Sequence, residues 1–306
     1  MKYFENKLEE YTKDSPDPRA AVSEFKNALD FFQRAKDTIP NDIDLIALDW
    51  AGIGDANCHS RLILENLASK RLKIAWCVTP KVAPLYKDDK KMLVIPSFYS
   101  PFRGGLTEWL DKKHNTLIDE MFDLFLPKQK HFHISAKVTS FFRQGKTASN
   151  FSDIFFKACE VERDFSIVHT LNHTGDYNIN GRYILLEHCG KSCGSIDTET
   201  CSSIVNNLKS INIQTVLVGA KEDAPILNCI DLRGLNLYDC FSVAKKSLGI
   251  IGKSSGNQSL FCFLRDKLIF EMEVPQGASY RTCSLHPNVI TLDRKNAIEK
   301  IREFLK

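Results

Sequence analysis

The chain has 306 residues, 43% of them hydrophobic, which favours two domains with packed cores and excludes a largely disordered chain. Its net charge of +3 is too small for a dedicated nucleic-acid-binding protein, so no nucleic acid is expected as a partner. No apolar stretch reaches the length of a signal peptide or a bilayer span, which predicts a cytoplasmic protein.

The first forty residues have the pattern of a helical extension, with a helix start at Asp17-Pro18 and apolar residues at helical spacing after it. A strand over 43–48, a glycine turn over 51–55 and a helix through 62–68 follow. Further strands are predicted over 73–78 and 92–95. Strands that alternate with helices indicate βαβ units and a parallel sheet.

The second half repeats this alternation with clearer spacing. Strands are predicted over 183–186, 215–218, 248–251, 268–273 and 288–292, and helices over 198–208, 237–246, 257–264 and from 293 to the end. We place the domain junction near Gly175. The expected organisation is a helical extension (1–41), an N-terminal Rossmann-like acceptor domain (42–174) and a C-terminal Rossmann-like nucleotide-sugar domain (175–306).

The cysteines give no sign of a disulfide framework or a zinc site. Most of the ten lie inside apolar runs, where a free cysteine acts as a small core residue. His188-Cys189 with Cys193 and Cys201 lacks the paired Cys-x2-Cys spacing of zinc sites. His131 and His133 share one strand face, but the sequence reveals no third ligand. No metal site is therefore predicted.

Parallel sheets bind ligands beyond the carboxyl ends of their strands, which directs attention to the turns there. The turn 51–55 lacks the third glycine of a dinucleotide-binding loop, but it places Asp55 at a helix start inside the predicted cleft. Asp55 is either a helix cap or a functional carboxylate. The loop 252–258 offers Lys253, Ser254, Ser255 and helix N–H groups, as a phosphate cradle or as an ordinary turn.

The order of these motifs resembles the heptosyltransferase-type glycosyltransferases of the GT-B class over roughly residues 43–306. It rests on Gly-Asp after the first strand, Val218 to Glu222, Ile230 to Asp239 and Gly252 to Gly256. The resemblance implies a GT-B-like α/β fold in which two Rossmann-like domains face a cleft. It also implies that Asp55 is the general base and that the loop 252–256 contacts the diphosphate of the donor.

The resemblance and the turn positions together define a set of donor-binding candidates. These are Gly54, Lys191, Ser192, Gly219, Glu222, Lys253, Ser254, Ser255, Gly256 and Asn257. Two departures from the family stand at Ser254, where an aspartate is usual, and at Ser259, where a histidine is usual. They leave open a catalytically silent nucleotide-sugar or glycan-binding protein, and a sugar-nucleotide hydrolase or epimerase.

The implied activity is inverting, metal-independent transfer of a sugar from a nucleotide-diphosphate sugar to a glycan, glycolipid or glycoprotein acceptor. The nucleotide sugar is then the donor substrate, and no bound cofactor is expected. The stretch 126–146 holds five basic residues and no acidic one: Lys128, Lys130, Lys137, Arg143 and Lys146. Such a patch suits a phosphorylated acceptor or peripheral contact with the inner face of a membrane, and a solvated face is the alternative.

Overall fold

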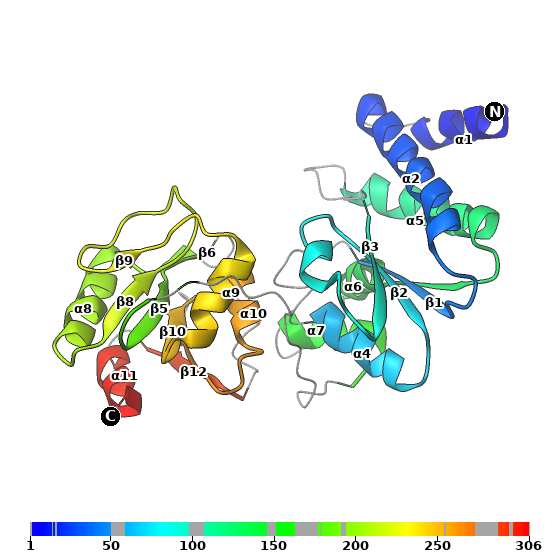
Figure 1. Cartoon of the computed structure of the whole chain (residues 1–306). Coiled ribbons are helices and arrows are strands. Elements are labelled where there is room, and N and C mark those ends of the chain that lie inside the picture. Colours follow the sequence, from blue (N-terminus) through cyan, green and yellow to red (C-terminus); the bar gives the residue numbers. More distant parts are fainter. Residues whose placement is uncertain are drawn as a thin grey trace. The chain divides into compact units, whose positions relative to one another are not determined.

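The structure is a computed structural model that divides into two compact units (Figure 1). It describes residues 2–13, 15, 17–49, 59–97, 107–145, 151–162, 177, 179–190, 194–253, 255–272, 287–293 and 296–305. The first unit comprises Met1–Gly52, Ile63–Thr147 and Lys157–Glu162, and the second comprises Ile53–Leu62, Ala148–Phe156 and Arg163–Lys306. The chain thus passes between the units more than once, and the predicted junction near Gly175 lies outside the described residues.

A four-stranded parallel sheet with the order β3-β2-β1-β4 forms the centre of the first unit. The elements up to residue 159 are α1 (Lys2–Thr12), α2 (Pro18–Thr38), β1 (Leu45–Leu48), α4 (Arg61–Ser69), β2 (Ile74–Val78), the 3-10 helix η2 (Ala83–Tyr86), β3 (Met92–Pro96), α5 (Thr107–Phe125), β4 (Lys130–His133), α6 (Ile134–Arg143) and α7 (Phe151–Cys159). Every residue of β1 and β2 is buried, as expected of strands covered on both faces.

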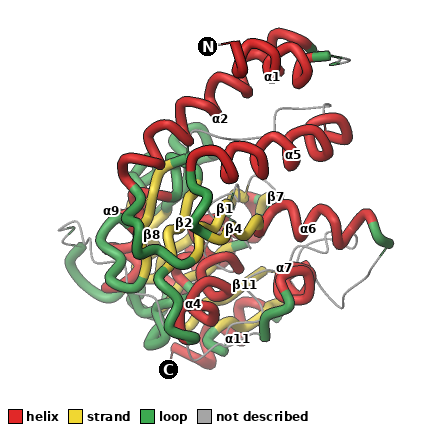
Figure 2. Tube along the Cα trace, turned by 90° about the vertical axis from the view of Figure 1, so that its right-hand side faces the viewer, coloured by secondary structure: helices red, strands yellow, loops and turns green. Residues whose placement is uncertain are grey.

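The N-terminal helices pack into the first unit. Helix α2 begins as predicted, because Pro18 occupies its first turn and the Asp17 side chain accepts a 3.0 Å hydrogen bond from the Ala20 N–H. The buried residues of α2 recur every three or four positions and so form one face. Helix α2 lies beside α5, and both contribute to the same core (Figure 2). The predicted single helical stretch is interrupted between α1 and α2, and both helices contribute to one core with β1, β2 and α5.

The second unit is built on a six-stranded parallel sheet with the order β12-β11-β10-β5-β8-β9. Its elements are β5 (Tyr183–Glu187), β6 (Cys189–Gly190), β7 (Gly194–Ser195), α8 (Thr198–Lys209), β8 (Gln214–Leu217), β9 (Ile230–Asp231), α9 (Leu237–Lys246), β10 (Gly249–Gly252), α10 (Gly256–Phe261), β11 (Leu268–Met272), β12 (Val289–Leu292) and α11 (Ala297–Leu305). This strand order is that of a Rossmann-type sheet. The predicted α/β class and the predicted strands and helices of this half are confirmed.

Two further expectations concern the cysteines and the membrane. The cysteines that the structure describes are all free, and most of them are buried, so their prediction as core residues is confirmed. Within the described ranges, no helix combines the length and the apolar character needed to cross a bilayer.

Candidate functional site

The connection order of the second sheet creates one switch point, between β5 and β10. From β5 the chain proceeds to β8 and β9 on one side, and then returns to β10 on the other side of β5. The connections that leave these two strands therefore diverge at their carboxyl ends, which is where open α/β sheets bind ligands. Glu187 ends β5 and Gly252 ends β10, and the two residues are register partners.

Glu187 holds the loop between β10 and α10. The Ser255 hydroxyl donates a 2.6 Å hydrogen bond to Oε2, and the Asn257 amide donates a 2.8 Å hydrogen bond to Oε1. Ser255 also accepts from the Gln258 N–H and so caps α10. Because Glu187 is only 3% exposed, these charge-assisted hydrogen bonds fix the loop firmly onto the end of β5.

A glycine is required at the end of β10. A Cβ atom on Gly252 would lie 2.7 Å from Oε1 of Gln258 and 3.0 Å from the carbonyl oxygen of Glu187. The Gln258 side chain is fully buried, and among the described residues its amide has no hydrogen-bond partner. A buried amide without a partner is destabilising, so the switch point contains polar groups that a ligand or a water molecule could satisfy.

Two further residues that the sequence singled out, Lys253 in the loop and Ser259 in α10, are buried. Lys253 is 1% exposed, and Ser259 is fully buried. The Ser259 hydroxyl donates to the Gly256 carbonyl inside the helix. Glu271, at the end of β11, is buried and is the second register partner of Gly252. Buried charges thus come from three neighbouring strand ends of this sheet.

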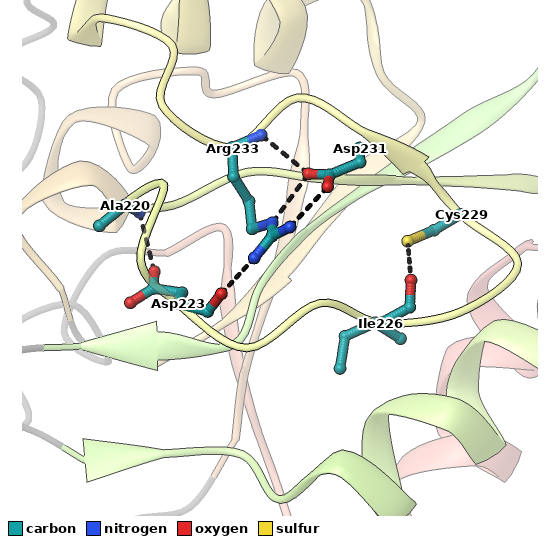
Figure 3. Close-up of polar contacts among 6 residues, drawn as sticks. All are labelled: Ala220, Asp223, Ile226, Cys229, Asp231 and Arg233. Atoms are coloured by element: carbon teal, nitrogen blue, oxygen red, sulfur yellow. Dashed lines mark hydrogen bonds and ion pairs between the residues drawn. The ribbon is translucent and has the colours of Figure 1, made fainter.

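An ion pair between Arg233 and Asp231 stabilises the turn after β8 (Figure 3). The Arg233 guanidinium donates to both carboxylate oxygens of Asp231, at 2.9 and 2.7 Å, and also to the Asp223 carbonyl. Arg233 holds the pKa of Asp231 at about 2. The Asp223 carboxylate accepts from the Ala220 N–H at 2.8 Å. Gly219 stands at the bend with φ +141°, and a Cβ there would lie 2.6 Å from an Asp223 oxygen.

The remaining candidates differ in how the structure places them. Glu222 is exposed in this turn, with its carboxylate open to solvent. His188 follows Glu187 and is 2% exposed, and burial lowers the pKa of its imidazole. Five candidates lie outside the described residues: Gly54, Asp55, Lys191, Ser192 and Ser254. The structure therefore brings Gly252, Ser255 and Asn257 together at the switch point and leaves the base assignment to Asp55 a prediction.

Two carboxylates beside the switch points, Asp49 and Glu187, were not predicted from the sequence. In the first sheet β4 lies on the side of β1 opposite to β2, so the switch point falls between β1 and β4. Asp49 directly follows β1 there and is 1% exposed. Its Oδ1 atom accepts a long hydrogen bond of 3.5 Å from the Ser135 hydroxyl. Both carboxylates stand at the end of a fully buried apolar strand, and this position is the signal that could have identified them.

Comparison with solved structures assigns the fold. The chain superposes on the ADP-heptose LPS heptosyltransferase II of E. coli with a TM-score of 0.57 at 10% identity, covering 86% of this chain and 98% of that one. For the E. coli heptosyltransferase WaaC with ADP, the TM-score is 0.51 at 14% identity, with coverages of 85% and 97%. The iron-containing dodecameric glycosyltransferase TibC of enterotoxigenic E. coli gives a TM-score of 0.54 at 11% identity.

The fold is therefore the GT-B-like α/β fold of heptosyltransferase-type glycosyltransferases, as the motif order predicted. At these identities the likeness defines the fold and not the reaction. The match covers 76% of this chain but only 58% of TibC, so the chain spans about three fifths of that protein. No protein-family model and no curated protein matches the sequence.

Proposed function

We propose that this protein is a glycosyltransferase that takes its sugar from a nucleoside-diphosphate sugar bound at the switch point of the second sheet. The observation that carries the proposal is the polar cluster there, where Glu187 fixes Ser255 and Asn257 beside the buried amide of Gln258. Proteins of the same fold supply the donor class, since WaaC was solved with ADP and TibC with ADP-D-beta-D-heptose.

The hydrogen bonds of the cluster distinguish the residues that position the loop from those that would contact the donor. Ser255 and Asn257 donate to Glu187, so they position the loop. The diphosphate contacts then fall to backbone N–H groups of the loop and to Lys191, Ser192 and Ser254. Glu222, an exposed carboxylate in the turn after Gly219, is suited to accept hydrogen bonds from ribose hydroxyls.

Transfer itself requires a base for the acceptor hydroxyl, and we assign this role to Asp55. As the acceptor oxygen bonds to the anomeric carbon, its proton passes to the Asp55 carboxylate. The bond from that carbon to the phosphate oxygen breaks, and its electrons remain on the leaving diphosphate. Attack from the opposite face inverts the anomeric centre. N–H groups and lysine side chains can stabilise the leaving charge without a metal ion.

The assignment is tested with the full-length protein, a panel of nucleotide sugars and a panel of glycan and glycolipid acceptors. Asp55→Ala should bind donor and keep the wild-type melting temperature, yet lose transfer by at least about two orders of magnitude. Asp37→Ala, which removes an exposed acid from α2, is the matched control and should transfer normally. Unchanged turnover in Asp55→Ala would remove Asp55 from the mechanism.

A catalytically silent binding protein is the second candidate. It is favoured by Ser259, which stands where the family has a histidine. The Ser259 hydroxyl donates a hydrogen bond to the Gly256 carbonyl. Donor binding without transfer or hydrolysis across the acceptor panel would support this candidate. A sugar product that forms without any acceptor would instead indicate a hydrolase or an epimerase.

The acceptor side is assigned to the basic stretch 126–146. Lys128 and Lys130 are exposed, and the Lys137 ammonium lies 5.1 Å from the centre of the Phe132 ring. A Lys128→Gln/Lys130→Gln variant should sediment less with vesicles that contain phosphatidylglycerol, and neutral vesicles should bind neither protein. Equal sedimentation of both proteins with the anionic vesicles would exclude membrane contact through these lysines.

A further inference from the structure

Three side chains with metal-binding atoms converge between α5 and β4 in the first unit. The Nε2 atom of His131 lies 3.0 Å from Oδ1 of Asp119, and the Nε2 atom of His133 lies 3.7 Å from the same oxygen. All three ligand atoms lie within 4.8 Å of one another. The sequence offered only the two histidines, because their partner stands twelve residues before His131 on a helix.

The surrounding structure holds these side chains in place. His131 and His133 are two residues apart on β4, so both rings lie on the sheet face that α5 covers. The buried Phe122 ring stacks on His131 with 4.3 Å between centroids and an interplanar angle of 8°. The same phenylalanine packs against His133 in a T-shaped arrangement, with 6.1 Å between the ring centroids. The imidazoles are therefore oriented by packing as well as by Asp119.

The two distances to Asp119 suit one cation that this carboxylate shares with both histidines. Around a tetrahedral ion with bonds of about 2.1 Å, neighbouring ligand atoms are about 3.4 Å apart, between the two distances observed here. Two imidazole nitrogens and one carboxylate oxygen form a ligand set of Zn²⁺ and of neighbouring divalent transition metals. We propose that Asp119, His131 and His133 form a binding site for a divalent transition-metal ion of the Zn²⁺ type.

Such an ion would link the edge strand of the first sheet to the helix that covers it. Among the strands that the structure describes, β4 is hydrogen-bonded only to β1, whereas Asp119 belongs to α5. The side chain of Asp119 is 57% exposed and that of His131 is 27% exposed, so solvent can supply the fourth ligand. The proposed sugar transfer uses no metal, and His131 and His133 lie within the stretch 126–146 that is assigned to the acceptor.

Metal binding is tested on untagged full-length protein that has been stripped with a chelator and then dialysed free of it. Calorimetric titration with Zn²⁺ should give saturable one-to-one binding, and the melting temperature should rise with added Zn²⁺. Titration with Co²⁺ should produce the visible absorption bands of a four-coordinate ion. None of these readouts depends on enzymatic activity.

Matched variants assign the ligands. Asp119→Asn and His131→Gln should each weaken Zn²⁺ binding by at least about tenfold. Asp123→Asn makes the same charge change at an exposed position four residues further along α5, and should bind like the wild type. Because Asp119 is largely exposed, Asp119→Asn should keep the melting temperature of the metal-free wild type. Wild-type affinity in Asp119→Asn, or no one-to-one binding in the wild type, would overturn the proposal.

Discussion

The hydroxyl of Ser255 donates a 2.6 Å hydrogen bond to the carboxylate of Glu187, although the two residues are 68 positions apart in the sequence. The bond joins the loop after β10 to the end of β5, the two strands that flank the switch point of the sheet. Glu187 is therefore a positioning residue. Under the proposed function, it determines where the loop 252–257 presents its N–H groups to the donor.

Removing this carboxylate should loosen the loop. Glu187→Ala deprives Ser255 and Asn257 of a charged acceptor in a buried place, which should lower the free energy of unfolding by about 2–3 kcal/mol. Urea denaturation measures the change, and donor affinity should fall with it. Glu303→Ala, at an exposed position on α11, is the control and should change stability by less than about 0.5 kcal/mol. Equal stability of the two variants would contradict the positioning role.

The turn after β8 should tolerate no side chain at Gly219. Gly219→Ala combines an unfavourable φ of +141° with a Cβ only 2.6 Å from the Asp223 carboxylate. We expect a loss of about 3 kcal/mol or more in thermal or urea unfolding. Gly145→Ala isolates the backbone contribution, because φ is +65° there and no described atom lies within 4 Å of the added Cβ. It should cost about 1–2 kcal/mol. A smaller loss at Gly219 than at Gly145 would contradict this account.

The regular elements of the second unit could be predicted from the sequence because local signals agree with the fold there. Apolar runs mark β5 and β10, and the caps at Asp197 and Asn236 begin α8 and α9 where the pattern placed them. Strand β4 was not among the predicted strands of the sheet, although His131 and His133 were expected to share a strand face. Its four residues, Lys-His-Phe-His, carry no apolar run, and their strand conformation depends on pairing with β1.

The site was predictable only in part, for a similar reason. The positions of Gly252, Ser255 and Asn257 after a buried strand could be read from the sequence, but their acceptor could not. The pairing with Glu187 depends on the register of β5 and β10, which is set by tertiary packing. Asp119 could likewise not be predicted as the partner of His131, because a contact between a helix and a strand brings the two together.

Stability should depend on pH through Glu24. Burial raises the pKa of its carboxyl from the ordinary 4.5 to about 7. The proton is therefore held more tightly in the folded chain, so this stabilisation is complete below about pH 4.5 and is lost as the pH rises through about 7. Relative to pH 5, the wild type should lose about 2 kcal/mol by pH 8 from this group, after allowance for its partial exposure.

Glu24→Gln removes the ionisation and should flatten this part of the profile. Urea denaturation at several pH values between 5 and 8 measures it. Glu5→Gln, an exposed substitution on α1, should retain the wild-type slope. The same slope in Glu24→Gln as in the wild type would rule out Glu24 as the titrating group.

The proposed function requires that the second unit binds a nucleoside-diphosphate sugar at its switch point. Its most direct test is calorimetric titration of the full-length protein with ADP, UDP, GDP and CDP and their sugars, with hydrogen exchange followed on the complex. We predict one-to-one binding of at least one of these ligands, with exchange slowed in 219–222 and 252–258. Absence of binding to every one of them, or protection confined to other segments, would contradict the claim.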